Sequence, residues 1–308
     1  MLDSNSIADD IKRQYKAGNM VTRLIIVNVA AFLVFLLLYI AILIVSGGKT
    51  GFFAVYEFFV APYNLKELLF KPWTLLSYMF MHGFTDRGPD FWHLLFNMLW
   101  LFIFGRTFVE LIGNSKVLPV YLMGGLLGVA VSLALFNLIP SLSANMPTSI
   151  VGASASVYAI VFATVFMQPN YHFQLFLIGR IKIKYIAIVM VISNLLMIAS
   201  KNNIGGAIAH LGGALFGILY IVNLNRGIDL AIPVNNFFDR IMGWFEPKNA
   251  PRVAYVNPQR TTRVKKEKPA VSNDIQLQLD EILDKISRSG YESLTKDEKS
   301  FLFNYSKD

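Results

Sequence analysis

The sequence predicts an all-α membrane protein, a bundle of six transmembrane helices with a small C-terminal helical extension. Of its 308 residues, 55% are hydrophobic and only 16% are charged, too little charge to cover a soluble protein of this size. Six apolar runs are separated mostly by short connections, as in a helical bundle. No strand-like alternation and no internal repeat competes with this interpretation.

The composition also limits the classes of function. A net charge of +8 could indicate a nucleic-acid partner, but the basic residues gather in the N-terminal tail, in certain short loops and after residue 225. That distribution is typical of charges held on the cytoplasmic side of a membrane, so we expect no nucleic acid. The chain has no cysteine, which excludes disulfides, thiolate metal sites and a cysteine nucleophile. No cleavable signal peptide is predicted, because the first apolar run lacks a small-residue cleavage pattern.

The membrane domain is expected over residues 24–225, after a cytoplasmic tail at 1–23. Leu24–Val45 carries no charge and would be roughly 33 Å long as a helix, enough to cross a bilayer. Lys49–Asp90 mixes aromatic and charged residues and is expected to lie in the membrane interface. Five further spans are predicted near Phe91–Phe104, Val117–Ile139, Ile150–Met167, Ile183–Ala199 and Ile204–Leu224.

The short loops predict the orientation of the bundle. With the N-terminus inside, the inner loops hold five basic residues: Arg106, Lys116, Arg180, Lys182 and Lys184. The loop at Pro140–Ser149 on the other side has no charge. Basic residues favour the cytoplasmic side, so both termini are expected there, in a multi-pass protein of the cell (inner) membrane.

Two segments are expected after the membrane domain. Residues 226–272 are interpreted as a basic flexible linker, since Arg252–Lys268 holds six basic residues and one acidic residue. Solvated disorder accounts for such a run, and contact with anionic lipid head groups is the alternative. Residues 273–308 are predicted to form a helical hairpin, with one helix at Asn273–Ser289 and a capping box at Thr295–Glu298 that opens a second.

Polar residues open three of the predicted spans. The second begins with His93 and Asn97 on one face, the fourth with Ser154 and Tyr158 on one face, and the sixth with His210. In the predicted topology these three spans run in the same direction, so their polar residues lie at the same, outer level. Polar groups inside spans are costly and usually functional.

Glycines accompany these polar residues. Gly152 would let backbone come close to whatever Ser154 acts on. Gly213 and Gly217 form a small-residue pattern that most often serves plain helix packing. In this chain the same pattern has a second consequence, because close packing of the fourth and sixth spans would bring His210 to Ser154.

The acidic residues that are missing narrow the chemistry. From Phe91 to Asn225 the sequence has a single acidic residue, Glu110, which excludes an intramembrane aspartate pair, a His-Glu-x-x-His metal helix and a Ser-His-Asp triad. No metal or cofactor is expected. A serine with a histidine base remains, and His93, Asn97 and the Ser154 N–H could stabilise an oxyanion. The residues alone leave open which histidine is the base. His82 and His172 are expected in or near loops, as solvated or capping groups.

These residues resemble the signature of the rhomboid family of intramembrane serine proteases. The resemblance covers roughly residues 24–225 and rests on three motifs: Gly152-Ala153-Ser154 with Tyr158, His93-x-x-x-Asn97, and Ala209-His210-x-x-Gly213-x-x-x-Gly217. It implies a rhomboid-like six-helix bundle, a Ser154–His210 dyad and an oxyanion hole from His93, Asn97 and the Ser154 amide. It also implies that Tyr158 packs on the His210 ring. Transmembrane proteins with small residues at the cut and a locally weakened helix are the implied substrates, cleaved near the outer face of the bilayer.

Two departures and two rival functions accompany this resemblance. The family usually has glycine after the serine, where this chain has Ala155, whose methyl group could crowd a substrate. Thr85–Asp90 resembles an insertion that lengthens a loop.

The first rival is a non-catalytic relative that binds and escorts membrane clients, which the presence of Ser154 and His210 disfavours. The second is a transporter, for which paired broken helices are not evident.

Overall fold

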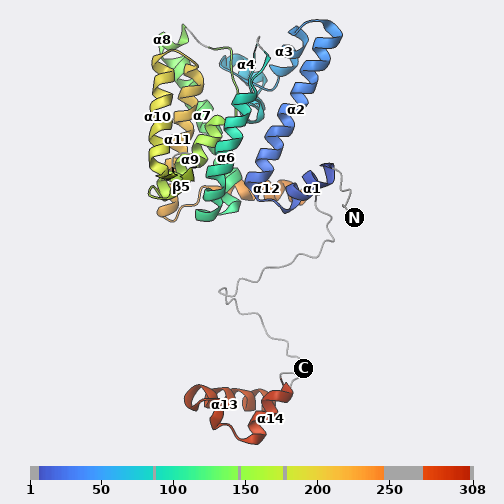
Figure 1. The fold of residues 1–308 in the computed structure, drawn as a ribbon, viewed down its shortest axis with the longest axis vertical. Coiled ribbons are helices and arrows are strands. Elements are labelled where there is room, and N and C mark those ends of the chain that lie inside the picture. The colour runs from blue at the N-terminus through green and yellow to red at the C-terminus, as the bar shows by residue number, and fades with distance from the viewer. Residues whose placement is uncertain (1–6, 86–87, 145–146, 176–178, 246–272, 306–308) are drawn as a thin grey trace. The chain divides into compact units, whose positions relative to one another are not determined.

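A computed structural model describes residues 7–85, 88–144, 147–175, 179–245 and 273–305. The chain divides into two compact units, Met1–Glu246 and Pro247–Asp308. The described part of the first unit contains six long apolar helices: α2 (Met20–Ser46), α6 (Phe91–Leu111), α7 (Val117–Leu138), α9 (Ser154–Met167), α10 (Ile183–Ala199) and α11 (Ile204–Asn225) (Figure 1). The chain is an all-α membrane bundle, as the sequence predicts.

Length separates these six helices into two groups. α2, α6, α7 with its preceding turn, and α11 are long and apolar enough to cross a membrane. α9 has 14 residues and α10 has 17, so as helices they are roughly 21 and 25 Å long, less than the hydrocarbon core of about 30 Å. A helix as short as α9 is too short to reach both surfaces of a bilayer.

Shorter elements connect the bundle. They are the helices α3 (Thr50–Tyr56), α4 (Leu65–Phe70), α5 (Thr74–Ser77) and α8 (Pro140–Ser143), the 3-10 turns η1 (Tyr78–Phe80) and η2 (Asn114–Lys116), and the strands β1 (Ala61–Pro62), β2 (Phe84–Thr85), β3 (Gly88–Pro89), β4 (Ser149–Ile150), β5 (His172–Leu175) and β6 (Gly179–Lys182). Each strand pairs with one partner, β1 with β4, β2 with β3 and β5 with β6. The long segment after α2 thus forms short helices, as expected of a segment that does not cross the bundle, and it buries Phe52, Tyr56 and Tyr78.

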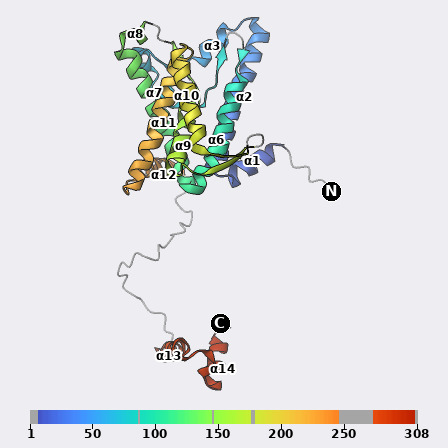
Figure 2. The same ribbon diagram turned by 60° about the vertical axis from the view of Figure 1, so that its left-hand side comes forward.

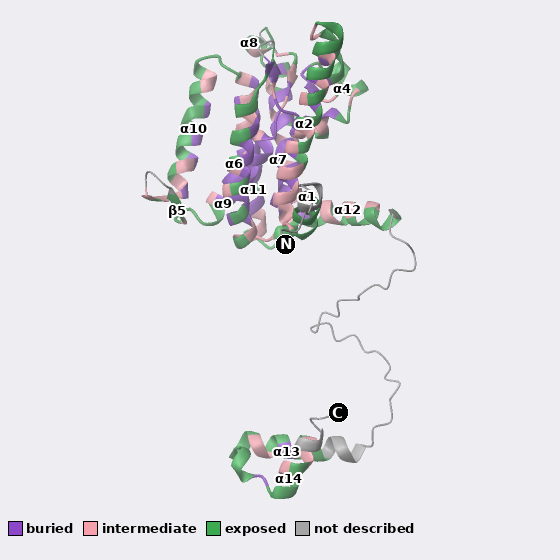
Figure 3. Ribbon diagram, turned by 45° about the vertical axis from the view of Figure 1, so that its right-hand side comes forward, coloured by how far each residue is buried: buried purple, intermediate pink, exposed green. Residues whose placement is uncertain are grey.

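α9 is the central helix of the bundle. Nine of its residues are buried, and it packs against α11, α7 and α6. Figure 3 shows the buried residues concentrated in α7, α9 and α11. α10 lies at the edge of the bundle in Figures 1 and 3, and Figure 2 turns this edge toward the viewer. The buried residues of α10 follow one helical stripe of Ile183, Ala187, Met190 and Asn194.

Small residues allow this close packing. A Cβ added to Gly217 would collide with the Ala159 carbonyl oxygen and lie 2.9 Å from the Ala163 nitrogen, and one added to Gly213 would collide with the Ala155 carbonyl oxygen. The predicted glycine pattern therefore sets backbone of α11 directly on backbone of α9.

Two boundaries of helices that line the pocket differ clearly from the sequence prediction. The fourth span begins at Ser154 rather than Ile150, because Ile150 pairs with Ala61 in a strand and Gly152 has a φ of +123°, which no helix accommodates. The second span continues beyond Phe104 to Leu111. Gly105 does not end this helix. It packs closely against α2, because a Cβ there would lie 2.9 Å from both Val21 methyl groups.

The N-terminal tail and the predicted flexible linker also contain helices. Part of the N-terminal tail forms α1 (Ile7–Ala17), and α2 begins at Met20, before the predicted start at residue 24. The predicted linker contains α12 (Ala231–Phe245). Just before this helix, Asp229 forms an ion pair with Lys116 at 3.4 Å and accepts a hydrogen bond from Tyr220. α1 and α12 lie at the same end of the bundle (Figure 1). The rest of the linker, 246–272, is outside the described residues.

The second unit contains the predicted hairpin helices, α13 (Asn273–Ser289) and α14 (Lys296–Tyr305), with a 3-10 turn η3 (Tyr291–Ser293) between them. The capping box is formed as expected: Thr295 N–H donates to the Glu298 carboxylate at 2.7 Å, and Glu298 N–H donates to Thr295 Oγ1 at 3.4 Å. Lys285 of α13 forms an ion pair with Glu298 at 2.8 Å, which joins the two helices.

Candidate active site

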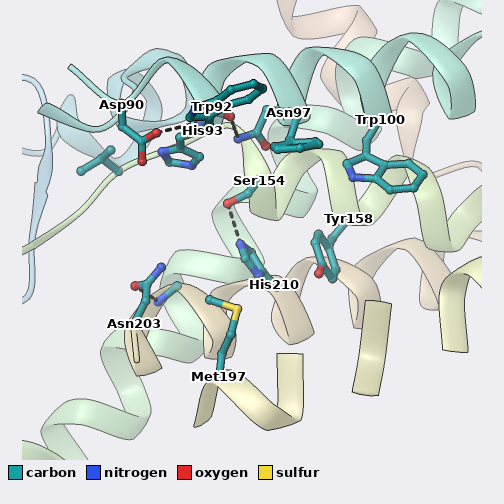
Figure 4. A pocket seen from close by; sticks show the side chains of 13 residues that line it. Asp90, Trp92, His93, Asn97, Trp100, Ser154, Tyr158, Met197, Asn203 and His210 are labelled. Carbon is teal, nitrogen blue, oxygen red and sulfur yellow. Dashed lines mark hydrogen bonds between the residues drawn. The ribbon is translucent and has the colours of Figure 1, made fainter. Parts of the chain in front are cut away.

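One pocket of about 380 Å³ collects polar residues from α6, α9 and α11. His93, Asn97, Ser154, Tyr158 and His210 all line it (Figure 4). The structure thus brings together the polar residues that open three separate helices. The remaining walls are largely apolar or aromatic and include Trp92, Phe96, Trp100, Val151 and Met197, none of which the sequence analysis identified.

Ser154 and His210 are in direct contact. Ser154 Oγ lies 2.7 Å from His210 Nε2, a hydrogen bond between α9 and α11. Tyr158, one turn after Ser154, stacks its ring on the His210 imidazole with centroids 4.4 Å apart and planes 12° apart. This stacking limits rotation of the imidazole, so its Nε2 stays directed at the serine oxygen.

The start of α9 leaves backbone donors free for the pocket. The first intrahelical bond of α9 is donated by Val157 N–H to Ala153 O at 2.9 Å, and no side chain caps this helix. The N–H of Ser154 therefore belongs to the group of helix N-terminal donors that need an acceptor outside the helix. The positive end of the helix dipole lies at the same place.

His93 and Asn97 face this helix start from α6. Gly83 N–H donates to His93 Nδ1 at 3.4 Å, so the hydrogen of the neutral imidazole is on Nε2. A Cβ added to Gly152 would lie 2.9 Å from His93 Nε2 and 3.5 Å from Ser154 Oγ, so both groups border the same space above Gly152. Asn97 donates one of its two Nδ2 hydrogens to His93 O at 2.7 Å, and the second hydrogen remains available to another acceptor.

Ala155 points away from the pocket. Its side chain is 2% exposed and does not line the cavity. A Cβ built on Gly128 would lie 2.7 Å from the Ala155 Cβ, so this methyl group packs between α9 and α7. The methyl group therefore occupies a helix interface and not the pocket.

The remaining two histidines have different environments. His172 is exposed in β5, as expected of a loop-like position. The expectation of a solvated or capping His82 is wrong, because this side chain is 1% exposed and its ring lies edge-on to that of His93, with centroids 5.5 Å apart. Burial lowers the pKa of His82 to about 3, with a smaller contribution from His93, so His82 stays neutral.

Asn194 of α10, which no sequence motif singled out, also contacts the site. Its Oδ1 lies 2.8 Å from His210 Nδ1, and its Nδ2 donates to Ala207 O at 2.7 Å. The signal was available: Asn194 is an uncharged polar residue within an apolar predicted span, where such groups usually need a partner or have a function. Asp90 was missed too, and it caps α6 by accepting a hydrogen bond from His93 N–H at 3.0 Å.

Within the described residues, no cluster of three or more histidine and acidic side chains is suited to hold a metal ion. The site therefore offers a hydroxyl, an imidazole and hydrogen-bond donors. Acyl chemistry at a serine needs this combination: a base that takes the hydroxyl proton, and donors for the negative charge that develops on a carbonyl oxygen.

Comparison with known proteins agrees with this description. Residues 69–226 match the family model of the Rhomboid domain, and residues 273–308 match a family of unknown function, DUF6576. The chain is 28% identical over 169 residues to the RHOMBOID-like protein 12, mitochondrial, of Arabidopsis thaliana. The aligned region covers 50% of this chain and 47% of that protein, so the chain spans about half the length of this curated relative. The Rhomboid domain match covers the four apolar helices that form the pocket, and the chain belongs to the rhomboid family.

Proposed function

We propose that this protein is an intramembrane serine endopeptidase in which Ser154 is the nucleophile and His210 the base. The observation that carries this proposal is the 2.7 Å hydrogen bond between Ser154 Oγ and His210 Nε2 in a pocket that also holds oxyanion donors. A serine hydroxyl attacks a carbonyl only when a base removes its proton, and the geometry supports this transfer. The escort function, by contrast, requires neither the hydrogen bond nor the donors.

The proposed reaction has two acyl-transfer steps. Ser154 Oγ attacks the peptide carbonyl carbon and its proton passes to His210 Nε2, so that the carbonyl oxygen becomes an oxyanion. His93 Nε2–H, the free Asn97 Nδ2–H and the Ser154 N–H are the donors for this charge. The tetrahedral intermediate then expels the amine, which takes the proton from His210. A water molecule then attacks the acyl carbon while His210 takes its proton. The bond to Ser154 Oγ breaks, Oγ takes this proton back from His210, and the carboxylic acid product leaves.

Transmembrane protein segments are the proposed substrates. The polar groups are surrounded by Trp92, Phe96, Trp100 and Met197, an apolar wall that suits an apolar peptide segment. The proposed orientation has both termini in the cytoplasm of a cell with the site near the outer face, supported by Lys116, Arg180 and Lys182 at the opposite end of the helices.

Covalent labelling by a serine-directed fluorophosphonate tests the proposal. The wild type in proteoliposomes should be labelled and should cleave a model single-span substrate, and Ser154→Ala should lose both activities. Ser156→Ala is the matched control, because Ser156 is fully buried and lies outside the pocket. A wild type that neither labels nor cleaves, or equal losses in both variants, would refute the assignment.

A further inference from the structure

We propose that Asn194 is a positioning residue that holds His210 in the tautomer able to accept the Ser154 proton; this inference rests on the proposed function. Asn194 lies on α10, while Ser154 and His210 lie on α9 and α11. A third helix thus takes part in the site through one hydrogen bond. The expected dyad becomes a chain of three side chains.

The hydrogen bonds around Asn194 determine the direction of its amide group. Nδ2 lies 2.7 Å from the carbonyl oxygen of Ala207, which can only accept, so the amide must present its N–H group there. Oδ1 is then directed at His210 Nδ1, 2.8 Å away. The opposite amide orientation would set two carbonyl oxygens against each other in a fully buried location.

This orientation fixes the proton on His210. Asn194 Oδ1 can only accept, so His210 Nδ1 must carry a hydrogen. A neutral imidazole protonated at Nδ1 has a lone pair at Nε2, and Nε2 is the atom 2.7 Å from Ser154 Oγ. The chain of donors and acceptors therefore runs from Ser154 through His210 and Asn194 to Ala207 O, and at each step one atom donates and the next accepts.

An amide suits this position better than a carboxylate. Asn194 is fully buried, on a helix whose other buried residues are Ile183, Ala187 and Met190. An ionised aspartate there would carry a large desolvation cost. When His210 takes the serine proton, Oδ1 of Asn194 still accepts from Nδ1, so the hydrogen bond persists while the imidazole is charged.

The tautomer can be measured without any turnover. Protein with ¹⁵N-labelled histidine in lipid bilayers should show His210 protonated at Nδ1 and not at Nε2, with its signals identified by their loss in His210→Ala. Asn194→Leu keeps the side-chain volume and removes the acceptor, so the Nε2-protonated tautomer should appear. A wild-type His210 protonated at Nε2 overturns the inference even if every Asn194 variant fails to fold.

Kinetics give the second measurement. Asn194→Leu should lower kcat by about 10- to 100-fold with little change in KM, as expected when an orienting hydrogen bond to an essential histidine is lost. Ser193→Ala is the control, because Ser193 is the neighbouring residue and bonds only to Met190 O in its own helix. A folded Asn194→Leu protein with unchanged kcat and unchanged tautomer refutes the inference.

The two proposals fail in different ways. Fluorophosphonate labelling of the wild type tests Ser154 as nucleophile, whichever tautomer His210 adopts. A wild type that labels but carries its His210 hydrogen on Nε2 overturns the role of Asn194 alone. A wild type that does not label overturns the proposed function, and with it the reaction that Asn194 would serve.

Discussion

Gly152 keeps the space between His93 and Ser154 open. Its φ of +123° lies where side chains are strained, and a Cβ would lie 2.9 Å from both Cε1 and Nε2 of His93. Two independent reasons thus require glycine here. One is the backbone conformation, and the other is the proximity of a proposed oxyanion donor.

Gly152→Ala should therefore displace His93 as well as strain the turn. We expect substrate cleavage to fall by about 10²–10³-fold, the usual effect of losing one oxyanion donor. Gly179→Ala is the matched control, because Gly179 also has a positive φ, +84°, but no neighbour near its added Cβ. Cleavage by the two variants in proteoliposomes is the measurement, and equal losses would mean that strain alone accounts for the effect.

Ala155 differs from the glycine usual in the family without narrowing the pocket. Because its methyl group packs toward Gly128, Ala155→Gly should leave the ratio of turnover on bulky and small substrates unchanged. Stability should fall by about 1 kcal/mol, since a helix loses a methyl contact and gains backbone freedom. Unfolding in detergent and turnover on a matched substrate pair measure both effects. A selective gain on the bulky substrate would place the methyl group in the path of the substrate.

At the scale of the element, the packing of α11 on α9 holds Ser154 and His210 within hydrogen-bonding distance. Gly217→Ala would press a methyl group onto backbone atoms of Ala159 and Ala163, which cannot rotate away. We expect a loss of about 1–3 kcal/mol of stability together with lower activity, because the helices carrying Ser154 and His210 must separate. Gly243→Ala in α12 is the control, since nothing lies near its added Cβ. Thermal unfolding and fluorophosphonate labelling should both distinguish the two variants.

The C-terminal hairpin should respond to acid through Glu298. Hydrogen bonds from Lys285 and Thr295 lower the pKa of Glu298 to about 2, from an ordinary value of 4.5. A carboxyl with a depressed folded-state pKa stabilises the hairpin above the unfolded pKa, and this stabilisation is lost as the pH falls from about 4.5 to about 2. Glu298→Gln should remove this acid-dependent loss.

Amide hydrogen exchange of α13 and α14 in the full chain is the measurement. Protection in the wild type should fall on acidification through that window, beyond the ordinary pH dependence of exchange. The variant should have lower protection at neutral pH and no such step. The same step in the variant would mean that another carboxyl controls the hairpin.

At the scale of the whole molecule, the proposed mechanism depends on which side of the membrane the pocket faces. The chain has no cysteine, so single cysteines can be introduced freely. Ser143→Cys in α8 should react with an impermeant thiol reagent added to intact cells, and Ser115→Cys in η2 should react only after permeabilisation. Both serines are exposed and make a matched pair. The opposite labelling pattern would invert the proposed topology.

Much of the bundle could be predicted from local patterns. Apolar runs predicted six helices, and the spacing of four between His93 and Asn97, and between Ser154 and Tyr158, predicted shared faces, because helical periodicity is a property of each segment alone. The boundary at Ile150 was wrong, because this residue pairs with Ala61, far away in the sequence. The boundary at Phe104 was wrong too, because the helix continues through Gly105, which packs against Val21. Hydropathy does not contain that information.

The sequence by itself determined the fold class, the family and five polar residues that meet at the pocket: His93, Asn97, Ser154, Tyr158 and His210. Few side chains other than histidine can take the proton of a serine, and the motifs around His93, Ser154 and His210 contain this combination. Only the tertiary structure decided that α10 contributes Asn194 to His210 and that the Ala155 methyl group faces Gly128. Both outcomes depend on which helices lie side by side and at what rotation. Those are set by the summed packing of whole helix surfaces, where each contact is weak and no short motif records the result.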